Sequence, residues 1–326
     1  MTTSVVDRGA AARPAQTPRR AGRAASRPGR RRTVLAGWGF LAPFAILFAF
    51  CFLIPIGVSI YQSFFRGVAS GGGLYGGGEL VNQFVGFENY VHYATSSAFW
   101  AGMGRVFLFG IVQVPLMILS ALGLALLLDS ASVRRVAGFR LGYFLPYAVP
   151  GVVAALIWTY MYNPQFSPIN QVLGLFGGHI DFFAPNIILW SMANMTTWTF
   201  TGYNMLIFLA ALQSIPHELY EAARMEGASE WTIVWAIKVP LVRNAMLLAV
   251  LLSIIGTVQL FNEPTVLQAV NPWMGADYTP MMMAYNTMMG GLSPSGDGPA
   301  SAISILMALI AGVLAVGYAL LQKKAD

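Results

Sequence analysis

Six long apolar stretches run through the chain, and shorter polar segments separate them. A helix needs roughly 20 residues to cross a hydrocarbon layer about 30 Å thick, and each stretch reaches that length. The predicted spans cover residues 34–65, 100–128, 141–162, 186–212, 244–267 and 300–321. The pattern therefore predicts an all-α, polytopic membrane protein with six transmembrane helices.

Arginine and lysine are unevenly distributed among the segments between these spans. Basic residues gather in the cytoplasmic loops of membrane proteins. If the N-terminus is cytoplasmic, six spans place every second segment between them in the cytoplasm, and only Arg66 and Arg105 lie outside these cytoplasmic segments. The cytoplasmic segments are residues 1–33, 129–140, 213–243 and 322–326, and they hold 17 of the 19 basic residues. Both termini are therefore predicted to be cytoplasmic.

The first 32 residues differ from the rest of the chain. They are rich in Ala, Pro and Gly and contain nine arginines and one acid, with no apolar periodicity. This composition predicts a disordered basic cytoplasmic tail, residues 1–32, ahead of a transmembrane domain, residues 33–326. A nucleic-acid-binding arm is the alternative interpretation. Because the apolar run begins directly after the arginines, the pattern favours a membrane-side anchor and no nucleic-acid partner.

Composition supports a membrane protein and offers little for catalysis or metal binding. The chain is 56% hydrophobic and only 10% charged, whereas soluble domains carry roughly 25% charged residues. Its one cysteine, Cys51, excludes a disulfide within the chain, and its three histidines are scattered. The methionine run 281–283 is more typical of adaptable apolar packing than of a metal site. No catalytic or metal-binding residue is predicted.

The segment from Ser214 to Pro240 predicts two short helices around a break. We expect Ser214 to cap the first helix, because serine accepts hydrogen bonds from free amides at a helix start. Gly227 is expected to end that helix in the left-handed conformation, and Ser229 to cap the second. A surface helix with an alanine face is suited to a groove of another protein. Residues 214–240 are therefore predicted to dock on another protein, and they are called the coupling segment below.

One motif in this segment is specific. Glu221-Ala222-Ala223 is followed at fixed spacing by Gly227, Ile237 and Pro240, with Val239 where leucine is usual. The string resembles the EAA loop of binding-protein-dependent ATP-binding-cassette (ABC) importer permeases. The resemblance implies a type I ABC importer permease fold. It also implies that Glu221, Ala222, Ala223 and Gly227 contact a separate ATPase dimer, which binds ATP and Mg, while this chain binds no cofactor.

Two further motifs resemble the carbohydrate-uptake branch of that family, of the maltose and glycerol-phosphate type. They are Gly86-Phe-Glu-Asn-Tyr90 in the first outer loop and Phe261-Asn-Glu-Pro-Thr-Val-Leu267 late in the fifth span. The resemblance implies a mono- or oligosaccharide substrate, a second homologous permease, an extracellular or lipid-anchored sugar-binding protein and a bacterial plasma membrane. The usual Gly-Gly-Pro after the second motif is absent, so the sugar stays open.

Polar side chains in the fourth and fifth spans are candidates for the substrate path. They are costly in lipid unless they face a cavity or one another. Glu263 is the one acid in this region, and we expect it at the outer interface. Hydrogen bonding between helices is the alternative role for each polar position. The candidates are Trp198, Tyr203, Asn204, Ser253, Thr257, Gln259, Asn262 and Glu263.

Other classes of protein fit the sequence less well. The chain lacks the G-x-x-x-x-G-K-[ST] loop of ATP-binding proteins, so energy would come from a partner. An ion-coupled secondary transporter would need buried ionisable residues in mid-span, and a membrane enzyme would need a nucleophile with its base. Neither is visible in the sequence. An ABC permease for another solute class remains the second alternative.

Overall fold

Most of the computed structural model is helical, and it describes residues 29–70, 79–130 and 136–325. The chain forms two units, Met1–Pro55 and Ile56–Asp326. The first contains α1 (Gly29–Phe48) and the π-helical turn η1 (Ala49–Leu53), and α2 (Ile54–Gln62) begins at its end. The tail prediction for residues 1–28 lies outside the described residues. Residues 29–32 belong to α1, so the helix begins earlier than the sequence predicted.

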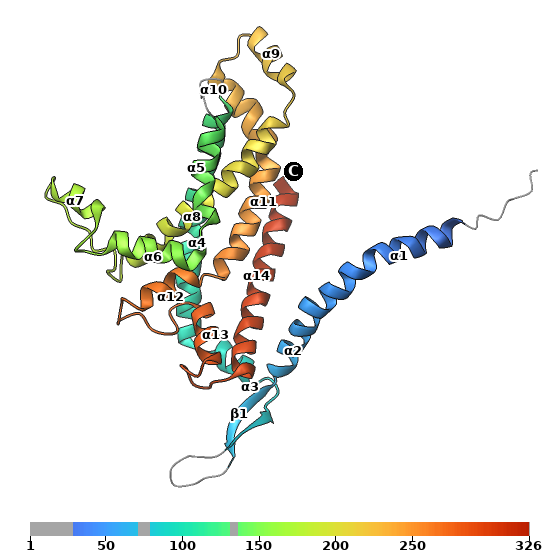
Figure 1. Ribbon diagram of the computed structural model, residues 1–326, viewed down its shortest axis with the longest axis vertical. Coiled ribbons are helices and arrows are strands. Elements are labelled where there is room, and N and C mark those ends of the chain that lie inside the picture. Colours follow the sequence, from blue (N-terminus) through green and yellow to red (C-terminus); the bar gives the residue numbers. More distant parts are fainter. Residues whose placement is uncertain (1–28, 71–78, 131–135, 326) are drawn as a thin grey trace, which may run out of the picture. The chain divides into compact units, whose positions relative to one another are not determined.

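Four long helices form the bundle of the second unit: α4 (Ser97–Asp129), α8 (Ile188–Gln213), α11 (Val239–Val258) and α14 (Asp297–Ala325). Helix α8 packs against α4, and α11 packs against α4, α8 and α14 (Figure 1). Apolar side chains from α4, α8 and α11 meet in one buried cluster, which includes Met117, Phe208 and Ala249. The three helices are thereby held side by side.

The two ends of this bundle carry different elements. At one end lie α9 (His217–Met225), α10 (Glu230–Ile233) and the π-helical turn η2 (Val234–Lys238). At the other end lie α3 (Glu88–Ala94), α13 (Pro280–Met288) and an antiparallel hairpin (Figure 1). The hairpin pairs β1 (Phe65–Ser70) with β2 (Glu79–Phe84), from Phe65 opposite Phe84 to Ser70 opposite Glu79.

This hairpin is a small exception in a chain that is mostly helical, as predicted, and it lies in the segment between the first two predicted spans. The side chain of Asn89 stabilises its base. Its amide donates to the carbonyl oxygens of Ser63 at 2.8 Å and Phe65 at 2.9 Å. Its Oδ1 accepts a hydrogen bond from Arg66 Nε at 2.9 Å. A short strand with few apolar residues carries little periodic signal, which explains why the sequence did not predict it.

The helices confirm a polytopic membrane protein and refine the number of spans. Four helical segments of the described chain are long and apolar enough to cross a membrane: Gly37–Gln62, Ser97–Asp129, Glu230–Gln268 and Asp297–Lys323. These match the first, second, fifth and sixth predicted spans. The fourth matches α8, whose 26 residues extend about 39 Å at 1.5 Å per residue but include many polar side chains. Helix α8 is therefore long enough to cross a membrane, but it is less apolar than the four segments named above.

The third predicted span is bent rather than straight. It consists of α5 (Val136–Ala148) and α6 (Gly151–Tyr162), which meet at 98°. Pro150 lies in the break, and proline disfavours helical geometry in the residue before it, here Val149. The prediction of one span from residue 141 to 162 is therefore wrong in shape. Counted as one broken span, the pair brings the number to five.

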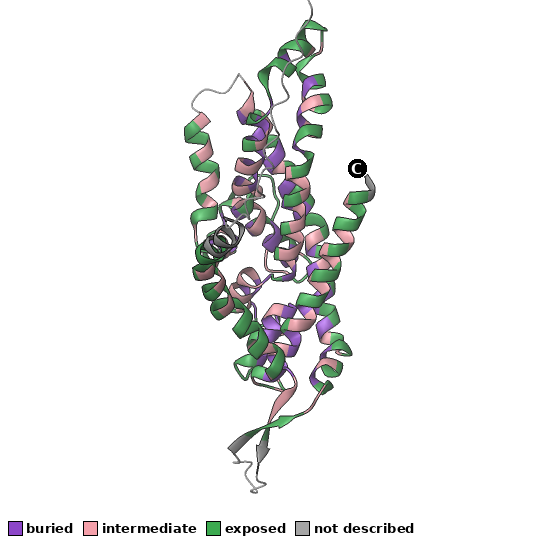
Figure 2. Ribbon diagram, turned by 90° about the vertical axis from the view of Figure 1, so that its right-hand side faces the viewer, coloured by how far each residue is buried: buried purple, intermediate pink, exposed green. Residues whose placement is uncertain are grey.

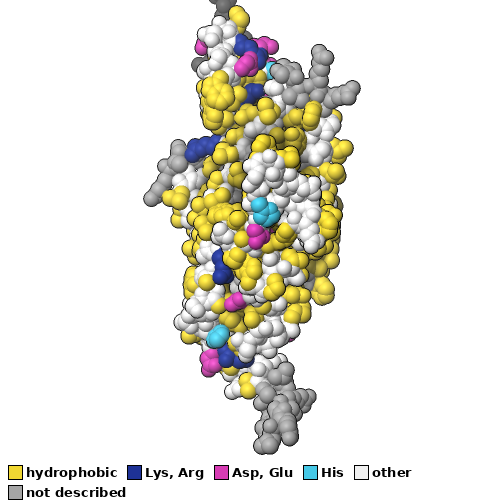
Figure 3. Space-filling view, turned by 90° about the vertical axis from the view of Figure 1, so that its left-hand side faces the viewer, with side chains coloured by type: hydrophobic (Ala, Val, Ile, Leu, Met, Phe, Trp, Pro, Cys, Tyr) yellow, Lys and Arg dark blue, Asp and Glu magenta, His cyan; other side chains and the backbone are white. Residues whose placement is uncertain are grey.

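Burial follows the inward faces of the bundle. Buried positions lie along the sides of α4 and α8 that face neighbouring helices (Figure 2). Large apolar side chains are exposed on the outside, for example Ile111 at 71% and Leu119 at 63%. Hydrophobic side chains cover most of the face in Figure 3, and charged side chains are sparse between its two ends. Such a surface is suited to lipid or to another membrane subunit.

Candidate functional site

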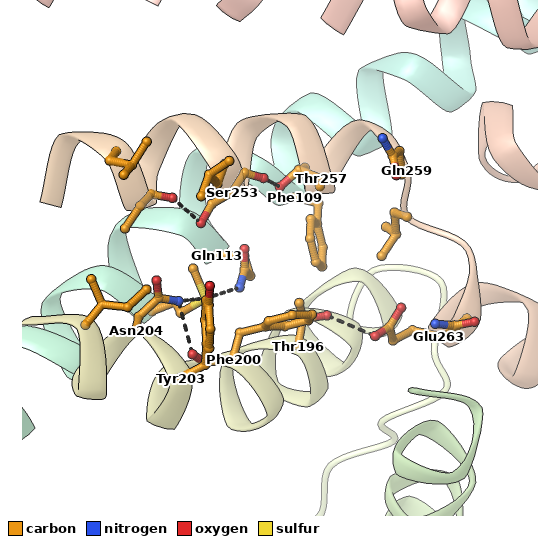
Figure 4. Close-up of a pocket in the computed structure, with 18 of the residues that line it drawn as sticks. Phe109, Gln113, Thr196, Phe200, Tyr203, Asn204, Ser253, Thr257, Gln259 and Glu263 are labelled. Carbon is orange, nitrogen blue, oxygen red and sulfur yellow. Dashed lines mark hydrogen bonds between the residues drawn. The ribbon is translucent and has the colours of Figure 1, made fainter. Parts of the chain in front are cut away.

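A pocket of about 400 Å³ lies between α4, α8, α11 and the segment that leads into α12 (Asn262–Gln268). Helix α4 contributes three side chains at four-residue spacing, Phe109, Gln113 and Met117, which share one helix face. Side chains from α8 and α11 face them across the pocket (Figure 4). Its further lining consists of Thr196, Phe200, Tyr203, Asn204, Ile207, Ala245, Leu248, Ala249, Leu252, Ser253, Gly256, Thr257, Gln259, Leu260, Phe261, Asn262 and Glu263.

Seven of the eight predicted substrate-path residues line this pocket. They are Tyr203, Asn204, Ser253, Thr257, Gln259, Asn262 and Glu263. Trp198 is not part of the lining and packs edge-on against Trp158, with ring centroids 5.8 Å apart. Each helical residue turns by about 100°, so Trp198 lies about 140° around α8 from Tyr203. The two aromatic residues therefore cannot face the same pocket, and the prediction for Trp198 is not supported.

The amides in the pocket are bonded weakly. Gln113 Nε2 lies 3.4 Å and Asn204 Nδ2 lies 3.6 Å from the same sulfur atom, Met117 Sδ. Asn204 Nδ2 also donates to the Phe200 carbonyl at 3.0 Å. A thioether sulfur is a weak acceptor, so a ligand oxygen that replaced it would form the stronger hydrogen bond. Both amides are therefore suited to bind a hydroxylated ligand.

Two hydroxyls on α11 bond to carbonyl groups of their own helix. Ser253 Oγ donates to the Ala249 carbonyl at 2.7 Å, and Thr257 Oγ1 donates to the Ser253 carbonyl at 2.8 Å. Both side chains line the pocket from one helix face. Since each hydroxyl uses its proton within the helix, its lone pairs are what it offers to a ligand.

Glu263 lies in the wall of the pocket, whereas the sequence analysis predicted that it lies at the outer interface of the membrane. It stands in the first turn of α12, and Thr196 Oγ1 donates to its Oε1 at 3.4 Å. It is the one acid in the lining (Figure 4). Anionic side chains are favoured at a helix start, which is where Glu263 stands.

Sequence reasoning missed the contribution of α4. Gln113 is a polar residue in the apolar stretch of α4 between Arg105 and Ser120, and it is 2% exposed. A buried polar residue in a span is costly unless it has a role, so Gln113 was a usable signal. Phe109 and Met117 lie one turn to either side of it, and only the structure shows that their common face borders the pocket.

The predicted coupling segment forms two short helices around a glycine turn, as expected. Gly227 has φ +83°, a conformation that side-chain-bearing residues rarely adopt, and it follows α9. Ser229 caps α10 by accepting a hydrogen bond from the Thr232 amide at 3.2 Å. The expected cap at Ser214 is wrong. Ser214 ends α8 and donates to the Ala211 carbonyl at 2.7 Å, while α9 begins at His217 after Pro216.

Helix α9 exposes most of its surface. Glu221, Ala222 and Gly227 are exposed, and Ala223 is half-buried against the bundle. Tyr220 is the one fully buried residue of α9 and anchors it in the cluster that also holds Met117. The motif residues thus divide into an outward side and an anchored side, as expected for a helix that docks on another protein.

A second anchor lies where α10 continues into α11. Lys238 Nζ and Asp129 Oδ2 form an ion pair at 2.6 Å, and Lys238 Nζ lies 5.1 Å from the centre of the Tyr220 ring. Burial raises the pKa of the Tyr220 phenol, and the negative charge of Asp129 raises it further. Three separate elements, α4, α9 and η2, therefore meet through these side chains.

These features define a polytopic helical membrane protein with a polar-lined pocket inside its bundle and a short exposed helix at one end. The family model for the binding-protein-dependent transport system inner membrane component matches residues 121–326, well over half of the chain. The chain belongs to this family and is a permease subunit of an ABC importer, a transport component rather than an enzyme. The resemblance carried by residues 221–240 is confirmed.

Curated relatives and solved structures agree with this assignment. The lactose transport system permease protein LacF of Rhizobium radiobacter is 33% identical over 234 residues, which cover 70% of this chain and 74% of LacF. The sulfoquinovosyl glycerol transport system permease protein SmoG of Agrobacterium fabrum is 29% identical over 286 residues, 87% and 89% of the two chains. A chain of a bacterial ABC transporter that imports the acidic polysaccharide alginate has the same fold. Its TM-score is 0.74 at 18% identity, over 90% of this chain and 96% of that one.

Proposed function

We propose that this chain is the permease subunit of a sugar importer in a bacterial cell membrane, and that the pocket is its half of the sugar path. The chemistry of the pocket lining carries the proposal. Phe109, Phe200, Tyr203 and Phe261 supply flat apolar faces, and Gln113, Asn204, Gln259 and Asn262 supply amides. Sugar rings combine apolar C–H faces with hydroxyls that both donate and accept, and this combination matches them.

The charge of the lining narrows the substrate class. Among the described residues, the pocket lining contains one acid, Glu263, and no Lys or Arg. An anionic sugar would leave water without meeting a cation in this lining. We therefore propose an uncharged mono- or oligosaccharide. The name of LacF, which refers to the neutral disaccharide lactose, supports this class, whereas the name of SmoG refers to a sulfonated and therefore anionic sugar derivative.

We further propose four partners. The exposed side of α9, with Glu221, Ala222 and Gly227, would dock on a separate ATPase dimer that binds ATP and Mg. A second, homologous permease would complete the path and cover part of the exposed apolar surface. An extracellular or lipid-anchored sugar-binding protein would deliver the substrate, and membrane lipids would surround the assembly. The family description supports the binding protein, because its members act in binding-protein-dependent systems.

The test uses the transporter assembled from this chain, its ATPase, the second permease and the binding protein, reconstituted in proteoliposomes. ATP-dependent uptake is measured for a panel of neutral sugars and for sugar phosphates and sugar acids. We expect uptake of a neutral sugar that depends on the binding protein. Uptake driven by an ion gradient without ATP would contradict the proposal, and preference for an anionic sugar would contradict the substrate class.

Gly227 gives the test a matched pair of variants. A Cβ at this position would meet nothing within 4 Å in the described part of the chain, so within the chain only the backbone conformation is at stake. Gly227→Val places a β-branched residue at positive φ and should lose most sugar-stimulated ATP hydrolysis. Gly227→Asn also adds a side chain to the docking face but should keep more of the activity, because asparagine tolerates this conformation. Equal activity of the two variants would show that the turn after α9 does not matter for coupling.

A further inference from the structure

Asp129 is placed where a carboxylate is unfavourable without a cation. It is the last residue of α4, at the negative end of the dipole of a 33-residue helix. Its side chain is 15% exposed, and that of its partner Lys238 is 10% exposed. A buried charge of this kind is tolerated only when it is paired, so each residue fixes the position of the other.

The pair joins elements that are distant in the chain. Asp129 and Lys238 are 109 positions apart, and they connect the end of α4 to the start of the run that becomes α11. Tyr220 adds α9 to the same contact, because Lys238 lies over its ring. The Tyr220 hydroxyl is buried and has no hydrogen-bond partner among the described residues. The cation and the buried ring therefore hold α9 at this point, without a bond from its hydroxyl.

The nearby charges do not compete for this contact. Glu230 is close enough to feel the charge of Lys238, but its carboxylate pairs with Arg224 at 2.8 Å. The Arg224–Glu230 pair links α9 to α10 across the Gly227 turn. Among the described residues, the connector between α8 and α11 thus shows two separate ion pairs, and the buried one of the two reaches α4.

Helix α4 leads from this contact directly to the pocket. It is a continuous helix from Ser97 to Asp129, and its Met117, Gln113 and Phe109 line the pocket roughly three to six turns away from Asp129. We propose that Asp129, Lys238 and Tyr220 form a joint that carries movement of α9 into α4, so that Asp129 and Lys238 are positioning residues for coupling. This inference rests on the proposed docking of α9 on an ATPase.

The experiment measures sugar uptake and ATP hydrolysis in the same proteoliposomes, with the complete transporter. The variants are Asp129→Asn, Lys238→Gln and the reversed pair Asp129→Lys with Lys238→Asp. We expect each single variant to lower the sugar transported per ATP by roughly threefold to thirtyfold, the range for residues that carry coupling. The reversed pair should recover part of that ratio, because it restores the attraction between α4 and η2 but not the cation over the Tyr220 ring. Co-purified ATPase and the thermal midpoint are measured alongside, to report on assembly.

Tyr318→Phe is the control. It removes a hydrogen bond between α14 and α11, from Tyr318 Oη to the Leu247 carbonyl at 3.1 Å, without touching α9 or α4. It should leave the ratio unchanged. Each of three results would overturn the joint. They are a lower ratio of sugar to ATP in this control, a wild-type ratio in the single variants, and a reversed pair that recovers none of the ratio. Loss of ATP hydrolysis and co-purified ATPase together, at an unchanged ratio, does so as well. If the wild-type transporter shows no ATP-dependent uptake, the proposed function itself has failed.

Discussion

The pocket and the connector between α8 and α11 use polar side chains in different ways. In the pocket, most polar groups are neutral and bond within their own helix, as Ser253, Thr257 and Asn204 do. In the connector, they are charged and bond between elements, as Lys238 and Asp129 do. The shape of the pocket therefore depends on how the helices pack, whereas the position of the connector depends on ion pairs and one glycine turn.

The largest effect is expected where α8 packs closely against α5. A methyl group at Gly202 on α8 would overlap the backbone of Tyr143 on α5. Overpacking a core costs roughly 1–3 kcal/mol of stability, and Gly202→Ala should destabilise the chain by at least that amount. The reason is that the backbone of Tyr143 can move away less easily than a side chain could. The measurement is the thermal midpoint and monodisperse yield of the purified chain. Gly142→Ala on α5, where nothing lies within 4 Å, is the matched control and should behave as wild type.

An intermediate effect is expected from the aromatic face of the pocket. Tyr203 lines it and stacks on Tyr147, with centroids 4.6 Å apart. Tyr203→Ala should raise the sugar concentration for half-maximal uptake by about threefold to tenfold, from lost stacking. Trp198→Phe should leave it unchanged, because Trp198 is outside the lining. The reverse result would mean that the sugar passes the other side of α8.

The smallest effect is expected from the exposed ion pair of the connector. The side chains of Arg224 and Glu230 are 53% and 70% exposed. Water and salt screen such a pair, so Arg224→Gln should cause no resolved shift in the thermal midpoint of the purified chain. A clear decrease would show that this pair also holds the connector, and the contrast with Lys238 and Asp129 would be lost.

The sequence predicted well those features that depend on local patterns. Long apolar runs predicted the helices of the bundle, and the motif at residues 221–240 indicated the family. Gly227 predicted the turn after α9. Seven of the eight predicted substrate-path residues line the pocket, because polar residues in a span are costly and so rarely accidental.

The predictions that were wrong or missing concern three-dimensional geometry that the sequence pattern did not specify. Trp198 and Tyr203 looked equivalent until the rotation of α8 separated them. Serine is a common residue at the start of a helix, but Ser214 instead follows Gln213 as the residue that ends α8. Pro150 is a local signal for a break, but the 98° angle between α5 and α6 and the pairing of β1 with β2 were not predicted. Asp129 and Lys238 gave no signal as a pair, because 109 residues separate them.

The π-helical turn η2 sets an angle within the connector. The Val239 amide bonds to the Val234 carbonyl, five residues back, and Pro240 has no amide hydrogen to form the usual bond to Ala236. One surplus residue is thus accommodated, and one residue corresponds to about 100° of helical rotation. Deleting it would turn α10 by that angle relative to α11. The number of residues between Ser229 and Pro240, and not only their identity, therefore encodes which side of the connector faces the bundle.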